Sequence, residues 1–116
     1  MAVISFSKKP EEIWGVAGWA FRQILEDVLA HFPQDSEMRA SFEFPLESSG
    51  LGLYELPPEL ASRITKAIQH VASGILDGTI RSGIVDKPYG TAETIEQYKS
   101  ALRRLLKAIP AHERKP

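Results

Sequence analysis

The sequence predicts a mainly α domain with three principal helices and a short hairpin or irregular insertion between the first two. Apolar residues recur at helical spacing over about residues 8–32, 57–77 and 91–109. Residues that begin or end helices bound each of these segments. A chain of 116 residues with 43% hydrophobic side chains can bury one core. We therefore expect residues 1–116 to form a single globular domain, with 110–116 as a frayed tail.

The first helix is predicted over about residues 8–32. Ser7 can cap it, Pro10 suits its first turn, and Pro33 ends it. Trp14 projects onto its apolar face, whereas Trp19 projects onto its polar face. We expect residues 34–56 to cover Trp19, unless its indole is offered to a partner.

Within the segment 34–56, residues 41–56 are predicted as a short hairpin. Phe42, Phe44 and Leu46 alternate with polar residues before a Ser/Gly turn, and a second apolar run follows that turn. Pro45 would confine its strand to an edge or a bulge. A short helix over residues 35–42, capped by Asp35 or Ser36, is the alternative.

The second and third helices have clear ends. Gly78 is expected to cap the second helix at its C-terminus, and Thr91 to cap the third at its N-terminus. Both helices carry apolar faces that need a partner to be buried. The connection over residues 79–90 is expected to be a long ordered loop, of a kind that is often functional.

The net charge of −1 is unevenly distributed. Residues 26–59 contain eight acids and one base, a net of −7, whereas residues 60–116 contain ten bases and five acids, a net of +5. Such asymmetry can indicate a charged partner. Adjacent carboxylates such as Glu26 and Asp27 are expected to be solvated on helix surfaces.

No pattern in the chain supports catalysis, a cofactor or a metal site. There is no cysteine, and the three histidines do not have the spacing of metal ligands. Nucleophile elbows and phosphate-binding glycine loops are also lacking. Any hydrolytic or transfer activity would be expected to use the 79–90 loop and His70, so a small enzyme with an unrecognised site stays an alternative.

The sequence favours a non-enzymatic protein-interaction domain. Aromatic residues among the acids of residues 26–59 suit a surface that meets a basic protein partner. Small acidic nuclease inhibitors, such as the immunity proteins that neutralise bacterial toxins, use surfaces of this type, so an inhibitor or immunity role is the most concrete form of the hypothesis. The candidate partner-binding residues are Trp19, Glu43, Phe44, Glu47, Tyr54 and Glu55.

A nucleic-acid-binding or regulatory role is the second hypothesis. Its candidate residues form a basic face on the third helix: Lys99, Arg103, Arg104 and Lys107, continued by Arg114 and Lys115. The stretch "TIEQYKSALRRLLKAI" resembles a helix in the core-binding domain of tyrosine recombinases, over that one helix only. A pI of about 6.3 is low for a duplex-binding domain.

Location and assembly follow from composition. The uncharged stretch over residues 13–21 is far shorter than the roughly 20 residues of a membrane-spanning helix. The N-terminus lacks the order of a secretory signal, so we expect a cytoplasmic protein without membrane contact. No long heptad pattern is present, so we expect a monomer or a small homo-oligomer.

Overall fold

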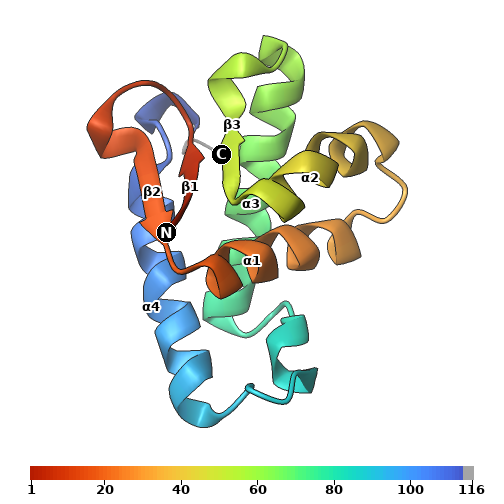
Figure 1. Ribbon diagram of the computed structural model, residues 1–116, viewed down its shortest axis with the longest axis vertical. Helices are drawn as coiled ribbons and strands as arrows, with labels where there is room; N and C mark the ends of the chain where they lie inside the picture. The colour runs from red at the N-terminus through yellow and green to blue at the C-terminus, as the bar shows by residue number, and fades with distance from the viewer. Residues whose placement is uncertain (114–116) are drawn as a thin grey trace.

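The computed structural model describes residues 1–113, which contain four α-helices and a three-stranded sheet (Figure 1). The helices are α1 (Gly18–His31), α2 (Ser36–Ser48), α3 (Pro58–Asp77) and α4 (Ala92–Ala108). The strands are β1 (Ala2–Ser5), β2 (Ile13–Val16) and β3 (Gly50–Gly52). Helices of 14, 13, 20 and 17 residues outweigh strands of 4, 4 and 3, so the mainly α prediction is confirmed. The prediction of three principal helices was incomplete, because α2 is a fourth helix.

Strands β1 and β2 form an antiparallel pair where the predicted first helix should begin. Ile4 lies opposite Trp14 and Ala2 opposite Val16, and all four side chains are buried. The prediction was therefore wrong for residues 8–17, since α1 begins only at Gly18. A helix from residue 8 would leave the backbone of β1 without its antiparallel partner, and unpaired buried peptide groups are costly.

The residues proposed to start that helix have other roles. Pro10 begins a 3₁₀ helix, Pro10–Glu12, between the two strands. The Ser7 hydroxyl donates to Glu12 Oε1 at 2.6 Å. Strand β3 pairs in parallel with β1, giving the sheet order β2-β1-β3. The buried indole N–H of Trp14 donates to the carbonyl oxygen of Ala101 at 2.9 Å, which ties β2 to α4.

Helix α2 replaces the predicted hairpin and runs beside α1 (Figure 1). The hairpin prediction was wrong, and the alternative helix is longer than the 35–42 considered. Asp35 caps it as that alternative proposed, because its Oδ1 accepts from the Met38 N–H at 3.1 Å. Met38, Phe42 and Pro45 are all buried and follow helical spacing, so core contact overrides the alternation of phenylalanines.

Helices α3 and α4 match their predicted ranges to within one residue. Gly78 has a left-handed φ of 86° and caps α3, and Thr91 Oγ1 accepts from the Thr94 N–H at 3.2 Å to cap α4. Beyond α4, Ala111–Glu113 form a 3₁₀ helix, and residues 114–116 of the predicted tail lie outside the described residues. None of the helices within residues 1–113 combines the length and the apolar composition that crossing a bilayer requires.

Candidate functional site

The structure divides the eight acids of residues 26–59 into two groups. Four engage partners within the fold: Asp27 is buried, Glu26 pairs with Lys87, and Asp35 and Glu37 pair with Arg63. The other four have exposed side chains: Glu43, Glu47, Glu55 and Glu59. Four of the eight acids therefore have partners within the fold, although Glu26 and Glu37 remain exposed.

The exposed side of α2 carries three of the candidate partner-binding residues. Glu43, Phe44 and Glu47 share one face of the helix together with Ala40, and we call these four residues the α2 acidic face. The Phe44 ring is 71% exposed, although the neighbouring Phe42 is fully buried. The Phe44 side chain therefore lies in solvent on the same helix face as two carboxylates.

Contacts with α3 hold α2 in place. Arg63 donates to Asp35 Oδ2 at 3.0 Å and to Glu37 Oε1 at 2.9 Å, so one guanidinium joins both residues at the start of α2. The hydrogen bond from Arg63 lowers the pKa of Asp35 below its ordinary value, and the Met38 N–H adds to this effect. With Phe42 anchored in the core, α2 presents its acidic face from a fixed position.

Tyr54 and Glu55 lie on a different element. Both belong to a 3₁₀ helix, Leu53–Glu55, that follows β3. Tyr54 is 45% exposed, and Lys8 Nζ lies 5.7 Å from its ring centroid. It lines a hollow of about 300 Å³ that also contains Glu12 and Glu113. These two candidates thus come from outside the α2 acidic face.

Trp19 is covered by a part of the chain other than the predicted one. Its ring centroid lies 6.3 Å from that of Tyr89 and 6.2 Å from that of Tyr98, which come from the 79–90 loop and from α4. The expectation that residues 34–56 would cover it was wrong, because the rings packed against it are those of Tyr89 and Tyr98. Trp19 stays half-buried and lines a separate pocket.

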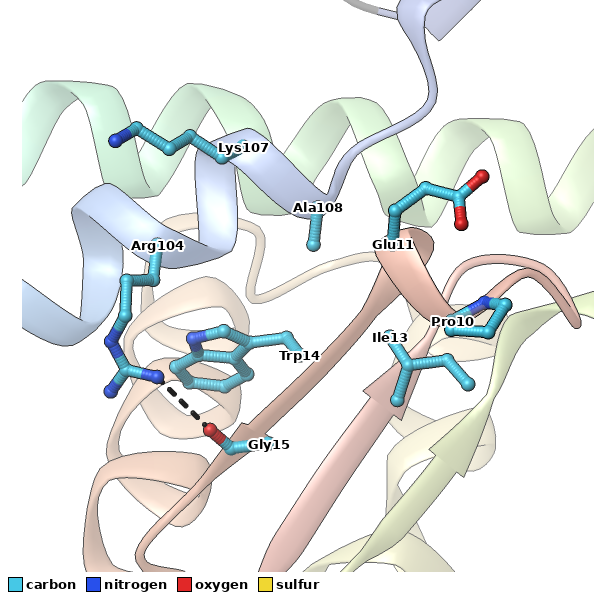
Figure 2. A pocket seen from close by; sticks show the side chains of 8 residues that line it. All are labelled: Pro10, Glu11, Ile13, Trp14, Gly15, Arg104, Lys107 and Ala108. Atoms are coloured by element: carbon cyan, nitrogen blue, oxygen red, sulfur yellow. Dashed lines mark hydrogen bonds between the residues drawn. The ribbon is translucent and has the colours of Figure 1, made fainter.

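The basic candidates of α4 do not form one free surface. Figure 2 shows Arg104 beside the indole of Trp14, with its guanidinium directed at the Gly15 carbonyl oxygen, to which it donates at 3.2 Å. Lys107 lines the same hollow of about 330 Å³, and so does the acid Glu11. The hollow thus combines two cationic side chains, one of them bonded to Gly15, with one acidic side chain.

The remaining basic candidates point elsewhere. Arg103 lies 3.7 Å from the carboxylate of Glu96. Lys99 lines another hollow with Ser82 and Tyr98. Arg114 and Lys115 lie outside the described residues. The structure therefore places Arg104 and Lys107 together and separates them from Lys99.

Asp27 is the polar residue that the sequence interpretation missed. It was expected to be solvated, yet it is only 5% exposed. Its Oδ1 accepts from Gln23 Nε2 at 3.0 Å and from the Gly83 N–H at 2.9 Å, while its Oδ2 accepts from Ser82 Oγ at 2.6 Å and from Tyr98 Oη at 2.8 Å. One carboxylate thereby joins α1, α4 and the 79–90 loop.

The Asp27 contacts also affect Tyr98. Burial raises the pKa of the Tyr98 phenol well above its ordinary value, and the nearby Asp27 carboxylate raises it further. The phenol therefore stays protonated and donates to Asp27. A signal for this tie existed in the sequence: Asp27 lies three residues after Ile24 and one before Val28, within the apolar arc of the helix.

The residues named for an enzymatic alternative do not converge. His70 lies against His31, with ring centroids 5.1 Å apart, and the 79–90 loop is tied to Asp27. Within residues 1–113, no group of three or more histidine, aspartate or glutamate side chains is arranged to hold a metal ion. The described residues thus offer no assembled set of reactive groups around His70.

Comparison of the chain with protein-family models, with curated proteins and with solved structures finds no match.

Proposed function

We propose that this chain is a non-enzymatic protein-interaction domain that binds a basic partner protein through the α2 acidic face. An inhibitor or immunity role is the most concrete form of this proposal. The observation that carries it is the exposed Phe44 side chain, which shares one helix face with Glu43 and Glu47 on a helix whose opposite side is anchored in the core.

The two kinds of residue would contribute differently to binding. A phenylalanine inserted into an apolar pocket of the partner supplies most of the affinity, as central aromatic residues do at interfaces. The carboxylates of Glu43 and Glu47 raise the association rate by steering a basic surface toward the helix. Because α2 is already fixed by Arg63, little conformational entropy is lost on binding.

The nucleic-acid alternative has weaker support. Arg104 donates to Gly15 and Arg103 lies close to Glu96, so both cations already have partners within the fold. Phosphate contacts would compete with these interactions for the two guanidinium groups. The α2 acidic face requires no such exchange, which is why we prefer the protein-interaction role.

A photo-crosslinking side chain at position 44 tests the proposal. The matched control places the same side chain at Val85, which is 41% exposed on the 79–90 loop. We expect position 44, and not position 85, to capture a basic protein from a lysate of the native host. The captured protein is then purified and titrated against variants of this chain.

In that titration, Phe44→Ala should raise the Kd more than tenfold, since hot-spot truncation costs about 2 kcal/mol or more. Glu43→Lys with Glu47→Lys should slow association and reduce its dependence on salt. Val85→Ala and Glu93→Lys are the matched controls and should bind as the unaltered chain does. Equal capture at both positions, or a Kd that neither change on α2 alters, would contradict the proposal.

A further inference from the structure

The pocket lined by Trp19 lies where α1, α4 and the 79–90 loop meet. Its lining residues are Trp19, Tyr89, Thr94 and Gln97, and its volume is about 280 Å³. Trp19 packs edge-to-face against Tyr89, which is itself 44% exposed. We call this the Trp19 pocket. It offers two accessible aromatic rings beside two polar side chains of one helix face.

The hydrogen bonds to Asp27 connect the elements that form this pocket. Tyr98 backs the Trp19 ring, and its hydroxyl is fixed on the buried Asp27 carboxylate. The same carboxylate binds the loop through Ser82 and Gly83, and Lys87 pairs with Glu26 at 3.2 Å. An aromatic wall held by such contacts loses little entropy when a ligand binds.

The turn that carries Tyr89 is also closely packed. A Cβ at position 90 would overlap the carbonyl oxygen of Ile84, so only glycine fits there. The Gly90 N–H donates to the Lys87 carbonyl oxygen at 2.9 Å, and the Thr91 N–H donates to that of Tyr89 at 2.9 Å. Tyr89 is therefore presented by an ordered turn.

Three polar groups of the Trp19 pocket have no hydrogen-bond partner within the protein. Among residues 1–113, no protein group bonds to the Trp19 indole N–H, the Tyr89 hydroxyl or the Gln97 amide. The four lining side chains are all uncharged. A ligand that matches this set is neutral, presents a compact apolar ring and has carbonyl acceptors that are not already bonded.

We propose that the Trp19 pocket binds a proline-bearing extended peptide segment. Proline rings are compact and apolar, and the extended polyproline conformation has no internal hydrogen bonds, so its carbonyl oxygens are free to accept from Trp19 and Tyr89. Aromatic-lined grooves recognise such segments in other domains because the peptide is already ordered before binding. This site is separate from the α2 acidic face, and the proposal does not depend on that surface.

The two tryptophans allow a direct test by NMR with a blocked hexaproline peptide. Trp14 is 2% exposed and its indole N–H is bonded to Ala101, so its signal serves as an internal control. We expect the peptide to shift the indole N–H signal of Trp19 and to leave that of Trp14 unchanged. A blocked hexaalanine peptide, which lacks the rings, should shift neither.

Conservative variants then test the donors. Tyr89→Phe and Gln97→Ala should each raise the Kd for hexaproline by about twofold to tenfold, the loss of one hydrogen bond. Tyr54→Phe is the matched control, because Tyr54 is 45% exposed and Tyr89 is 44% exposed, and its Kd should not change. The inference is overturned if hexaproline leaves the Trp19 signal unmoved, if hexaalanine binds equally well, or if the Tyr89 and Gln97 variants bind as tightly as the unaltered chain.

Discussion

Replacing Asp27 by alanine removes an acceptor that four donors share. The donors belong to α1 (Gln23), the 79–90 loop (Ser82 and Gly83) and α4 (Tyr98), and their distances to the carboxylate are 3.0, 2.6, 2.9 and 2.8 Å. Gln23 and Tyr98 are buried, so the change leaves them without a partner. We expect a large loss of stability from this one substitution.

The size of the loss can be worked from these contacts. Each buried donor left unsatisfied costs about 1–3 kcal/mol, and two or three of the four are placed to incur it. Alanine also removes the cost of burying a charged carboxylate, which offsets part of this loss. We therefore expect a net loss of about 3–5 kcal/mol in the free energy of unfolding, similar to the cost of breaking a buried ion pair. That is a large share of the roughly 5–15 kcal/mol typical of a whole domain.

Urea unfolding followed by tryptophan fluorescence measures this loss. Asp27→Asn should cost less than Asp27→Ala, because the amide keeps one acceptor and the hydroxyls of Ser82 and Tyr98 can turn to accept from it. Asp86→Ala is the control, since Asp86 pairs with Arg81 at 2.8 Å on the exposed surface and should leave the midpoint unchanged. If Asp27→Ala shifts the midpoint no further than Asp86→Ala, the carboxylate does not hold the loop and the reasoning is refuted.

Two further predictions concern α2. Phe42→Ala should destabilise the protein by about 3–5 kcal/mol and Phe44→Ala by no more than about 0.5 kcal/mol, because the helix buries one ring and exposes the other; equal losses in thermal or urea unfolding would favour the hairpin. The pKa of Asp35 is lowered mainly by Arg63, so the stability from its ionised form is complete above the unfolded-state value of 3.8 and is lost as the pH falls through the lower folded-state value. Acid unfolding of Asp35→Asn below pH 3.8 should therefore depend less on pH, and an unchanged slope would show that the Arg63 contact contributes nothing.

The ranges of α3 and α4 could be predicted because their signals are local and agree with one another. Each helix carries a continuous apolar face, and its cap is set by a residue with a specific backbone role, Gly78 at one end and Thr91 at the other. Glu43, Phe44 and Glu47 were grouped in the sequence only by their nearness along the chain. Their arrangement on one face was not predictable from a hairpin assumption.

Tertiary contacts decided the rest. The stretch around Trp14 satisfies both a helical and a strand spacing, and it becomes a strand because β1 needs a partner and α4 accepts the indole N–H. Phe42 and Phe44 lie on different faces because the segment is a helix. Met38 and Pro45 are buried on the same side of that helix as Phe42. From the sequence, Asp27 was expected to be a surface acid. In the structure it accepts hydrogen bonds from donors 55, 56 and 71 residues away in the chain. Local spacing fixes which residues can share a face, but only long-range packing determines which of two permitted spacings buries its apolar side chains and satisfies its backbone.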